Sequence, residues 1–185
     1  NTTGNSTGGA NSTGGGISNG GTLTVINSTV SGNSTGTGPS MGGGIFSFTT
    51  LKLINCTITK NFSPDDLGNG VSGHQGTITV ANTIIAGNGD SANDPDLNNP
   101  LFTPPSFVSQ GHNLIGNADG FASSFNATGD QKGTGAAPLN PQLGLLANNG
   151  GPTFTHALLS NSPALDAGDN ARAAIFRIES IDVGR

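Results

Sequence analysis

The stretch GGGISNGGTLTVINSTVSGN, residues 14–33, decides the fold because its pattern recurs twice along the chain. The further copies are GGGIFSFTTLKLINCTITKN at residues 42–61 and GNGVSGHQGTITVANTIIAGN at residues 68–88. A repeat of 27–28 residues predicts a solenoid, in which each repeat packs only against its neighbours. The aligned columns are Gly16, Gly44 and Gly70; Ile17, Ile45 and Val71; Leu23, Leu51 and Ile78; Val25, Leu53 and Val80; Asn27, Asn55 and Asn82; Val30, Ile58 and Ile85; and Asn33, Asn61 and Asn88.

The alternation of side chains within one copy predicts strands. Leu23 and Val25 alternate with threonines, which is the period of a strand with one buried face. Val30 lies five residues after Val25 and must still point inward, so we expect the chain to bend at Asn27. Three short strands per copy would form one triangular coil. They are expected around Ile17, across residues 23–26 and around Val30.

Coils of this kind stack in parallel at about 4.8 Å per turn, so the predicted fold class is all-β, a right-handed parallel β-helix with an irregular, loop-rich C-terminal part. Like residues then lie on like residues, and we expect Asn27, Asn55 and Asn82 to form an internal ladder of side-chain hydrogen bonds. Gly at the start of each copy is expected to make a tight corner. We divide this single domain into the tail of an earlier coil at residues 1–13, three regular coils at residues 14–88, and irregular coils, loops and a cap at residues 89–185.

The composition excludes several classes of protein. Only 9% of the 185 residues are charged, but the apolar residues are regularly placed and lack a helical period, which argues against both disorder and helix. A net charge of −5 with 6 Lys and Arg leaves no basic groove for nucleic acid. No apolar run approaches the roughly 20 residues that span a bilayer, and the single Cys56 cannot form an intrachain disulfide. Because the sequence opens at Asn1 without Met, we expect a mature or excised portion of a longer protein.

The second half carries motifs that are less periodic. GHNLIGN at residues 111–117 is expected to contain a further inward strand. The order GGGI, LTVINSTVSGN, IIAGN, PDL, GHNLIGN, PQLGLLANNGGPTFTHAL and SPALDAGD, across residues 14–170, resembles the C-terminal parallel β-helix region of large bacterial surface proteins of the choice-of-anchor Q group. The resemblance implies a secreted or surface-exposed protein and offers no catalytic residues to carry over. The run ARAAIFRIES at residues 171–180 departs from the pattern of the group, and a closing strand is expected only at residues 181–184.

A polysaccharide lyase or hydrolase is the alternative from a different class. Lyases of this fold need a base beside carboxylates that hold Ca²⁺, and hydrolases need paired carboxylates from neighbouring coils. The outward columns carry Thr, Ser and Asn instead, so we predict no enzyme activity, no catalytic residue and no cofactor. The spacing of His74, His112 and His156 suits no metal motif.

Two groups of residues are candidate sites. Asp90, Asp94 and Asp96 place three carboxylates within seven residues, which makes a candidate Ca²⁺ site, although an Asx-rich turn has the same composition. Asn27 and Asn55 fit the Asn-X-Ser/Thr pattern but are expected to be buried in the ladder. The candidate glycosylation sites are therefore Asn1, Asn5, Asn11 and Asn126.

These patterns together predict a non-catalytic extracellular structural or adhesive module at the cell surface. A fibre would form if the coils of neighbouring copies stacked end to end. The expected partners are copies of the chain itself, other β-helix coils of a longer chain, and surface glycans. The alternative is a carbohydrate-binding or polysaccharide-cleaving β-helix, and a threonine-based ice-binding face is a third hypothesis.

Overall fold

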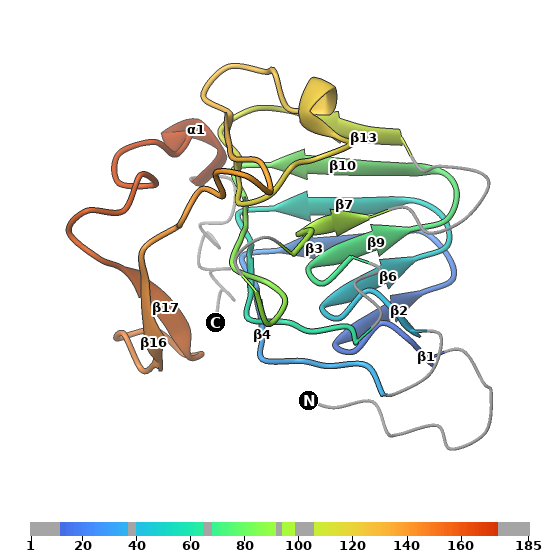
Figure 1. Cartoon of the computed structure of the whole chain (residues 1–185). Coiled ribbons are helices and arrows are strands. Elements are labelled where there is room, and N and C mark those ends of the chain that lie inside the picture. Colours follow the sequence, from blue (N-terminus) through green and yellow to red (C-terminus); the bar gives the residue numbers. More distant parts are fainter. Residues whose placement is uncertain (1–11, 37–39, 65–67, 92–93, 99–105, 174–185) are drawn as a thin grey trace, which may run out of the picture.

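The computed structural model describes residues 12–36, 40–64, 68–91, 94–98 and 106–173. These residues form a parallel β-solenoid with almost no helix, which confirms the predicted fold class (Figure 1). Three parallel sheets make the sides of the solenoid, and each repeated coil adds one strand to every sheet. None of the helices in the described ranges has the length and apolar character needed to cross a membrane.

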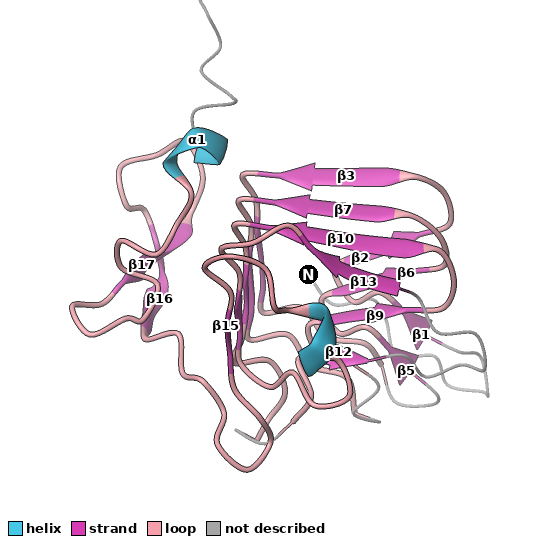
Figure 2. Ribbon diagram, turned by 90° about the horizontal axis from the view of Figure 1, so that it is seen from above, coloured by secondary structure: helices cyan, strands magenta, loops and turns pink. Residues whose placement is uncertain are grey.

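The strands of each sheet come from successive coils (Figure 2). The first sheet contains β2 (Ile17–Asn19), β6 (Ile45–Ser47), β9 (Val71–Gly73) and β12 (Leu97–Asn98). The second contains β3 (Leu23–Ile26), β7 (Leu51–Ile54), β10 (Thr77–Ala81) and β13 (Ser106–Ser109). The third contains β4 (Thr29–Ser31), β8 (Thr57–Thr59), β11 (Ile84–Ile85), β14 (Leu114–Ile115) and β15 (Gln131–Lys132). A further parallel pair joins β1 (Ser12–Thr13) and β5 (Ser40–Met41).

The register between coils follows the sequence repeat. Leu23 pairs with Leu51, and Leu51 pairs with Ile78 in the next coil. In the third sheet Val30 pairs with Ile58. The aligned columns of the sequence are therefore stacked columns of side chains, as predicted.

The apolar columns form the core of the solenoid. Eight of these side chains are 0% exposed, and each such burial contributes about 1.5–3 kcal/mol to the free energy of unfolding. They are Ile45, Leu51, Leu53, Ile58, Val71, Ile78, Val80 and Ile85. The expected inward strand of the GHNLIGN motif is confirmed too, because Leu114 and Ile115 in β14 are 3% and 0% exposed.

The bend expected after the second strand is present. Asn27, Asn55 and Asn82 have φ values of 49°, 53° and 49°, and His112 has 57° at the same corner of the next coil. Asn tolerates this left-handed conformation better than most residues because its short polar side chain can bond locally. The bend changes the parity of the chain, so both Val25 and Val30 can face the core.

The two ends of the solenoid differ. At the C-terminal end, a loop that includes the 3₁₀ turn η1 (Ala122–Ser124) lies against β13. Phe107, Phe121 and Phe125 pack together there, with ring centroids 4.9 Å apart for the first two and 6.3 Å apart for Phe107 and Phe125. Phe125 is 1% exposed, so this loop closes the core.

The last described segment leaves the solenoid. β16 (Leu143–Ala147) and β17 (Thr155–Leu158) form an antiparallel hairpin. The chain then returns along the third sheet to the short helix α1 (Asn170–Ala173). We call residues 159–173 the C-terminal strap. The expected closing strand at residues 181–184 lies outside the described residues.

Close packing of glycine sets the distance between coils. A Cβ atom added to Gly44 would lie 2.6 Å from the carbonyl oxygen of Gly70 and 2.9 Å from Nδ2 of Asn61. Neither neighbour can move without separating two coils. The column of Gly16, Gly44 and Gly70 is thus needed for close approach, while positive φ falls two residues earlier, at Gly14, Gly42 and Gly68.

We predict that Gly44→Ala lowers the free energy of unfolding by about 1–3 kcal/mol or more, because overpacking forces the coils apart. Gly20→Ala is the matched control, since nothing lies within 4 Å of its added Cβ. Urea denaturation of both variants measures the difference. Equal stability of the two variants would show that the glycine column is not a packing constraint.

Candidate functional site

Two asparagine columns run along the solenoid, and the structure separates them. The column predicted as the ladder, Asn27, Asn55 and Asn82, does form side-chain hydrogen bonds along the axis. Asn55 Nδ2 donates to Asn27 Oδ1 at 3.0 Å, and Asn82 Nδ2 donates to Asn55 Oδ1 at 2.8 Å. We call it the corner column because it lies at the bend between the second and third sheets.

The predicted interior position of this column is wrong. Asn27 is exposed, and Asn55 and Asn82 are only half-buried. The left-handed conformation at the bend turns these side chains outward and sends the following residue inward. Those following residues in the next coils are buried: Cys56, Thr83 and Asn113 are 3%, 1% and 1% exposed.

The buried ladder is the second asparagine column, which we call the interior ladder. Its members Asn33, Asn61 and Asn88 are 7%, 0% and 3% exposed. Each donates from its backbone N and from Nδ2 to the side-chain oxygen of the next member, at 3.1 and 2.9 Å for Asn33 to Asn61 and for Asn61 to Asn88. Nδ2 of Asn61 also donates to the carbonyl of Val30 at 2.9 Å. One residue per coil therefore satisfies several polar groups inside an apolar core.

Asp96 ends the interior ladder. Its Oδ1 accepts from the backbone N and Nδ2 of Asn88 at 3.1 and 2.8 Å, and its Oδ2 accepts from the backbone N of Asn117 at 2.7 Å. A carboxylate only accepts hydrogen bonds, so it can receive donors from both sides. Burial raises the pKa of Asp96 to about 6, although the bonds from Asn88 and Asn117 act in the opposite direction.

The column that follows the corner also ends on a carboxylate. The backbone N of Cys56 donates to Thr83 Oγ1 at 3.2 Å, and the backbone N of Thr83 donates to Asn113 Oδ1 at 3.1 Å. Asn113 in turn donates from its backbone N and Nδ2 to Asp130 Oδ1, both at 3.0 Å. Ser109 Oγ donates to the other oxygen of Asp130 at 2.6 Å. Asp96 and Asp130 thus occupy equivalent places in two columns.

The C-terminal strap binds along the corner of the solenoid, bonding to one residue in each of four successive coils. The carbonyl of Arg172 accepts from Asn55 Nδ2 at 3.2 Å, and the backbone N of Asp169 donates to Asn82 Oδ1 at 2.8 Å. The carbonyls of Ala167 and Pro163 accept from His112 Nδ1 and Gln131 Nε2, both at 2.8 Å. Since a carbonyl only accepts, Nδ1 of His112 carries the proton. The exposed corner column is therefore the docking line of the strap.

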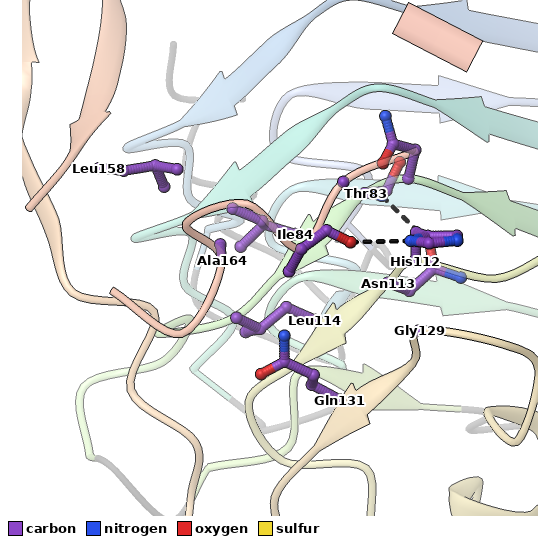
Figure 3. A pocket seen from close by; sticks show the side chains of 12 residues that line it. Thr83, Ile84, His112, Asn113, Leu114, Gly129, Gln131, Leu158 and Ala164 are labelled. Carbon is purple, nitrogen blue, oxygen red and sulfur yellow. Dashed lines mark hydrogen bonds between the residues drawn. The ribbon is translucent and has the colours of Figure 1, made fainter. Parts of the chain in front are cut away.

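A hollow of about 140 Å³ remains between the strap and the coils (Figure 3). Ile84 and Leu114 from the third sheet face Leu158 and Ala164 across it, and His112 and Gln131 lie at its polar edge. Pockets for drug-sized ligands are about 300–1,000 Å³. This hollow is smaller and belongs to the packing of the strap.

A second hollow, of about 170 Å³, lies between the coils and residues 138–141. Asn88 and Asp96 form part of its wall. The carboxylate oxygens of Asp96 already accept from three N–H donors, so this acid joins neighbouring parts of the fold.

The candidate Ca²⁺ site is not brought together. Asp96 points into the solenoid, as described above, whereas Oδ2 of Asp94 accepts from the backbone N of Asp90 and of Ser91 at 2.9 and 3.0 Å. Asp90 itself is exposed. Among the described residues, no three His, Cys, Asp or Glu side chains lie close enough together to hold a metal ion. The carboxylate of Asp94 thus bonds to backbone N–H groups of the loop that precedes it.

The histidines take part in local contacts. His156 is 8% exposed and joins the hairpin to the first coil, because its Nε2 lies 2.8 Å from Ser31 Oγ and its Nδ1 donates to the carbonyl of Gly144 at 2.8 Å. His74 packs edge-on against Phe48, with ring centroids 5.8 Å apart. The three histidines lie apart from one another: His74 follows β9, His112 is at the corner of the fourth coil, and His156 is in β17.

The candidate glycosylation sites fall in two regions. Asn126 is exposed, and its amide bonds to the carbonyl of Ser123 and to Lys132. Asn1, Asn5 and Asn11 lie outside the described residues. Asn27, which also fits the Asn-X-Ser/Thr pattern, was expected to be buried but is exposed at the corner.

We predict that Asp96 makes stability depend on pH. The folded pKa of about 6 lies above the ordinary value of 3.8, so the folded protein holds this proton more tightly than the unfolded chain. The resulting stabilisation is complete below a pH of about 4, is lost as the pH rises through about 6, and amounts to about 3 kcal/mol. Asp96→Asn removes this titration.

Urea denaturation of the native protein and of Asp96→Asn across this pH range measures the effect. We expect the free energy of unfolding of the native protein to fall relative to that of Asp96→Asn as the pH rises. Parallel pH profiles for the two proteins would contradict the assignment.

We also predict that the two asparagine columns differ in energetic weight. Asn61→Ala leaves the buried backbone N–H and Nδ2 of Asn33 without their acceptor and removes one donor to the carbonyl of Val30, so we expect a loss of about 3 kcal/mol or more. Asn27→Gly can still adopt the left-handed φ of the bend and removes only an exposed side chain. Its loss of unfolding free energy should therefore be below about 1 kcal/mol. A larger loss for Asn27→Gly would reverse the assignment of the interior ladder.

No family model matches the chain, and no curated protein or solved structure is similar to it at a significant level. The assignment to the parallel β-solenoids therefore rests on the strands, their register and the columns described above.

Proposed function

We propose that the chain is a non-catalytic structural module of an extracellular or cell-surface protein, in which a rigid solenoid spaces or displays other parts of the molecule. One observation carries the proposal: two carboxylates and two of the histidines hold parts of the fold together. Asp96 and Asp130 end two columns, while His112 and His156 hold the strap and the hairpin. Acids and histidines that hold parts of the fold together make the solenoid rigid.

The composition of the outer surface supports a surface location. Its neutral hydroxyl and amide groups can bond to water and to glycans without a strong electrostatic field. The motifs that resemble the choice-of-anchor Q group of bacterial surface proteins support the same location. The adhesive role that we propose uses this neutral surface rather than a pocket.

The closed C-terminal end favours a spacer over a fibre of identical copies. Head-to-tail stacking would require the end of one copy to receive the first coil of the next. The packed rings of Phe107, Phe121 and Phe125 occupy that end. We therefore propose a module that ends a solenoid.

Carbohydrate recognition is the second candidate, and one observation favours it. Phe48 is 41% exposed and is held edge-on by the buried Phe46, at a centroid distance of 4.7 Å. An exposed ring of fixed orientation can stack on the apolar face of a sugar. This candidate site lies at the corner between β6 and β7.

We predict that the purified chain releases neither unsaturated sugars nor new reducing ends from a panel of acidic and neutral polysaccharides, with or without Ca²⁺. Mild protease treatment of intact source cells should release its peptides, as expected for a protein at the cell surface. Catalytic release of sugar would overturn the structural proposal. Saturable glycan binding that is lost in Phe48→Ala, but kept in the matched variant Phe154→Ala on the hairpin, would establish the second candidate.

A further inference from the structure

The N-terminal face of the first coil carries three unused hydrogen-bonding groups. The backbone N–H of Thr29, Nδ2 of Asn27 and Oδ1 of Asn33 have no partner in the described part of the chain. The equivalent groups one coil later all bond back to the first coil. The backbone N–H of Thr57 donates to the carbonyl of Ser28 at 2.9 Å, and Asn55 Nδ2 donates to Asn27 Oδ1 at 3.0 Å. Asn61 Oδ1 accepts from Asn33 Nδ2 at 2.9 Å.

The same face exposes the end of the apolar core. Ile17, Leu23 and Val25 are only partly buried, whereas the residues that pair with them one coil later are 0% exposed. A hollow of about 330 Å³ opens here, with Ile17, Val25 and Val30 among its walls. The face therefore combines an apolar centre with fixed polar groups at its edge.

Three strand edges surround this hollow. In the described residues β2, β3 and β4 each pair on one side only, with β6, β7 and β8. Figure 2 shows β3 as the outermost strand of the second sheet. An unpaired edge is a template for another strand, and proteins usually cover it.

We propose that this face is the docking surface for one further parallel β-coil, continuous with the N-terminal side of the chain, that carries Asn at both column positions. This inference rests on the proposed structural function. The interface between the first and second coils supplies its geometry. Under the same translation, an Asn of the added coil accepts from Asn27 Nδ2 at the corner, and another donates to Asn33 Oδ1 inside. A backbone carbonyl of that coil accepts from the N–H of Thr29.

The direction of the hydrogen bonds selects this occupant over a second copy. On the N-terminal side of the first coil, the interior ladder needs a donor to Asn33 Oδ1, and the corner column needs an acceptor for Asn27 Nδ2. A parallel coil provides both at once. The C-terminal end of a second copy is closed by its Phe125 loop, and two copies joined face to face would pair their strands antiparallel and break the column register.

The sequence contains part of such a coil. Residues 3–8, TGNSTG, repeat residues 31–36, SGNSTG, and Asn5 lies 28 residues before Asn33. These residues are outside the described ranges. In this register a copy of residues 14–28 placed directly before Asn1 completes one coil.

The test uses the full chain with that copy added at its N-terminus. We expect hydrogen exchange of the Thr29 amide to slow by about tenfold or more, and the urea midpoint of unfolding to rise, because the added coil pairs the open edges. The matched control carries the same added residues in scrambled order and should leave both quantities unchanged. Replacing the corner Asn of the added segment by Ala, or Asn5→Ala in the extended chain, should remove part of the gain.

Equal exchange in the coil and scrambled extensions would overturn the proposal. So would a dimer of the unextended chain, seen by sedimentation, that dissociates when Val25→Lys is introduced at the open face, because that result assigns the face to a second copy. Both readouts are independent of polysaccharide turnover. Failure of the docking proposal and failure of the proposed structural function are therefore distinguishable.

Discussion

The hydrogen bond from one interior Asn to the next is the interaction on which the rest of the structure depends. A triangular coil must turn its backbone several times inside an apolar core, and each turn leaves N–H and carbonyl groups that strand pairing does not reach. Asn61 shows how one side chain solves this, since it accepts from Asn33, donates to Asn88 and reaches the carbonyl of Val30. The bonds repeat only if the coils keep a common register. The glycine column, which fixes how closely coils approach, follows from the same requirement.

The ladder also has a direction, and this direction explains how the solenoid ends. Each bond between members of the interior ladder is donated toward the C-terminal end, so the last member must only accept. It meets donors from Asn88 on one side and from Asn117 on the other. Another amide there would place its own N–H against the backbone N–H of Asn117. A carboxylate avoids this conflict, which accounts for Asp96 and, in the neighbouring column, for Asp130. The burial that raises the pKa of Asp96 is therefore a consequence of ending a ladder inside the core.

Periodicity allowed the coils, the bend and the apolar columns to be predicted, because stacking turns a sequence repeat directly into contacts. It could not tell the corner column from the interior ladder. Both are asparagines at constant spacing, and the difference arises from the left-handed φ at Asn27, which reverses the side-chain direction. Asp96 was hidden for another reason: it follows Asn88 by only eight residues, so the repeat offers no alignment for it. The docking of the strap depends on tertiary contacts that no period encodes.

Stacking also explains the composition that first suggested disorder. A column places equivalent residues about 4.8 Å apart, and two like charges at that distance in water repel by about 1 kcal/mol for every coil added. Lys52 shows the tolerated case, because it pairs with Thr24 in the coil before and with Thr79 in the coil after. A second lysine in either position would meet it directly. Neutral Asn, Ser and Thr carry no such cost, and Asn bonds to Asn along the axis. The low charge of this chain is therefore a property of a stacked solenoid. Regular apolar columns, rather than a high content of charged residues, distinguish such a sequence from that of a disordered segment.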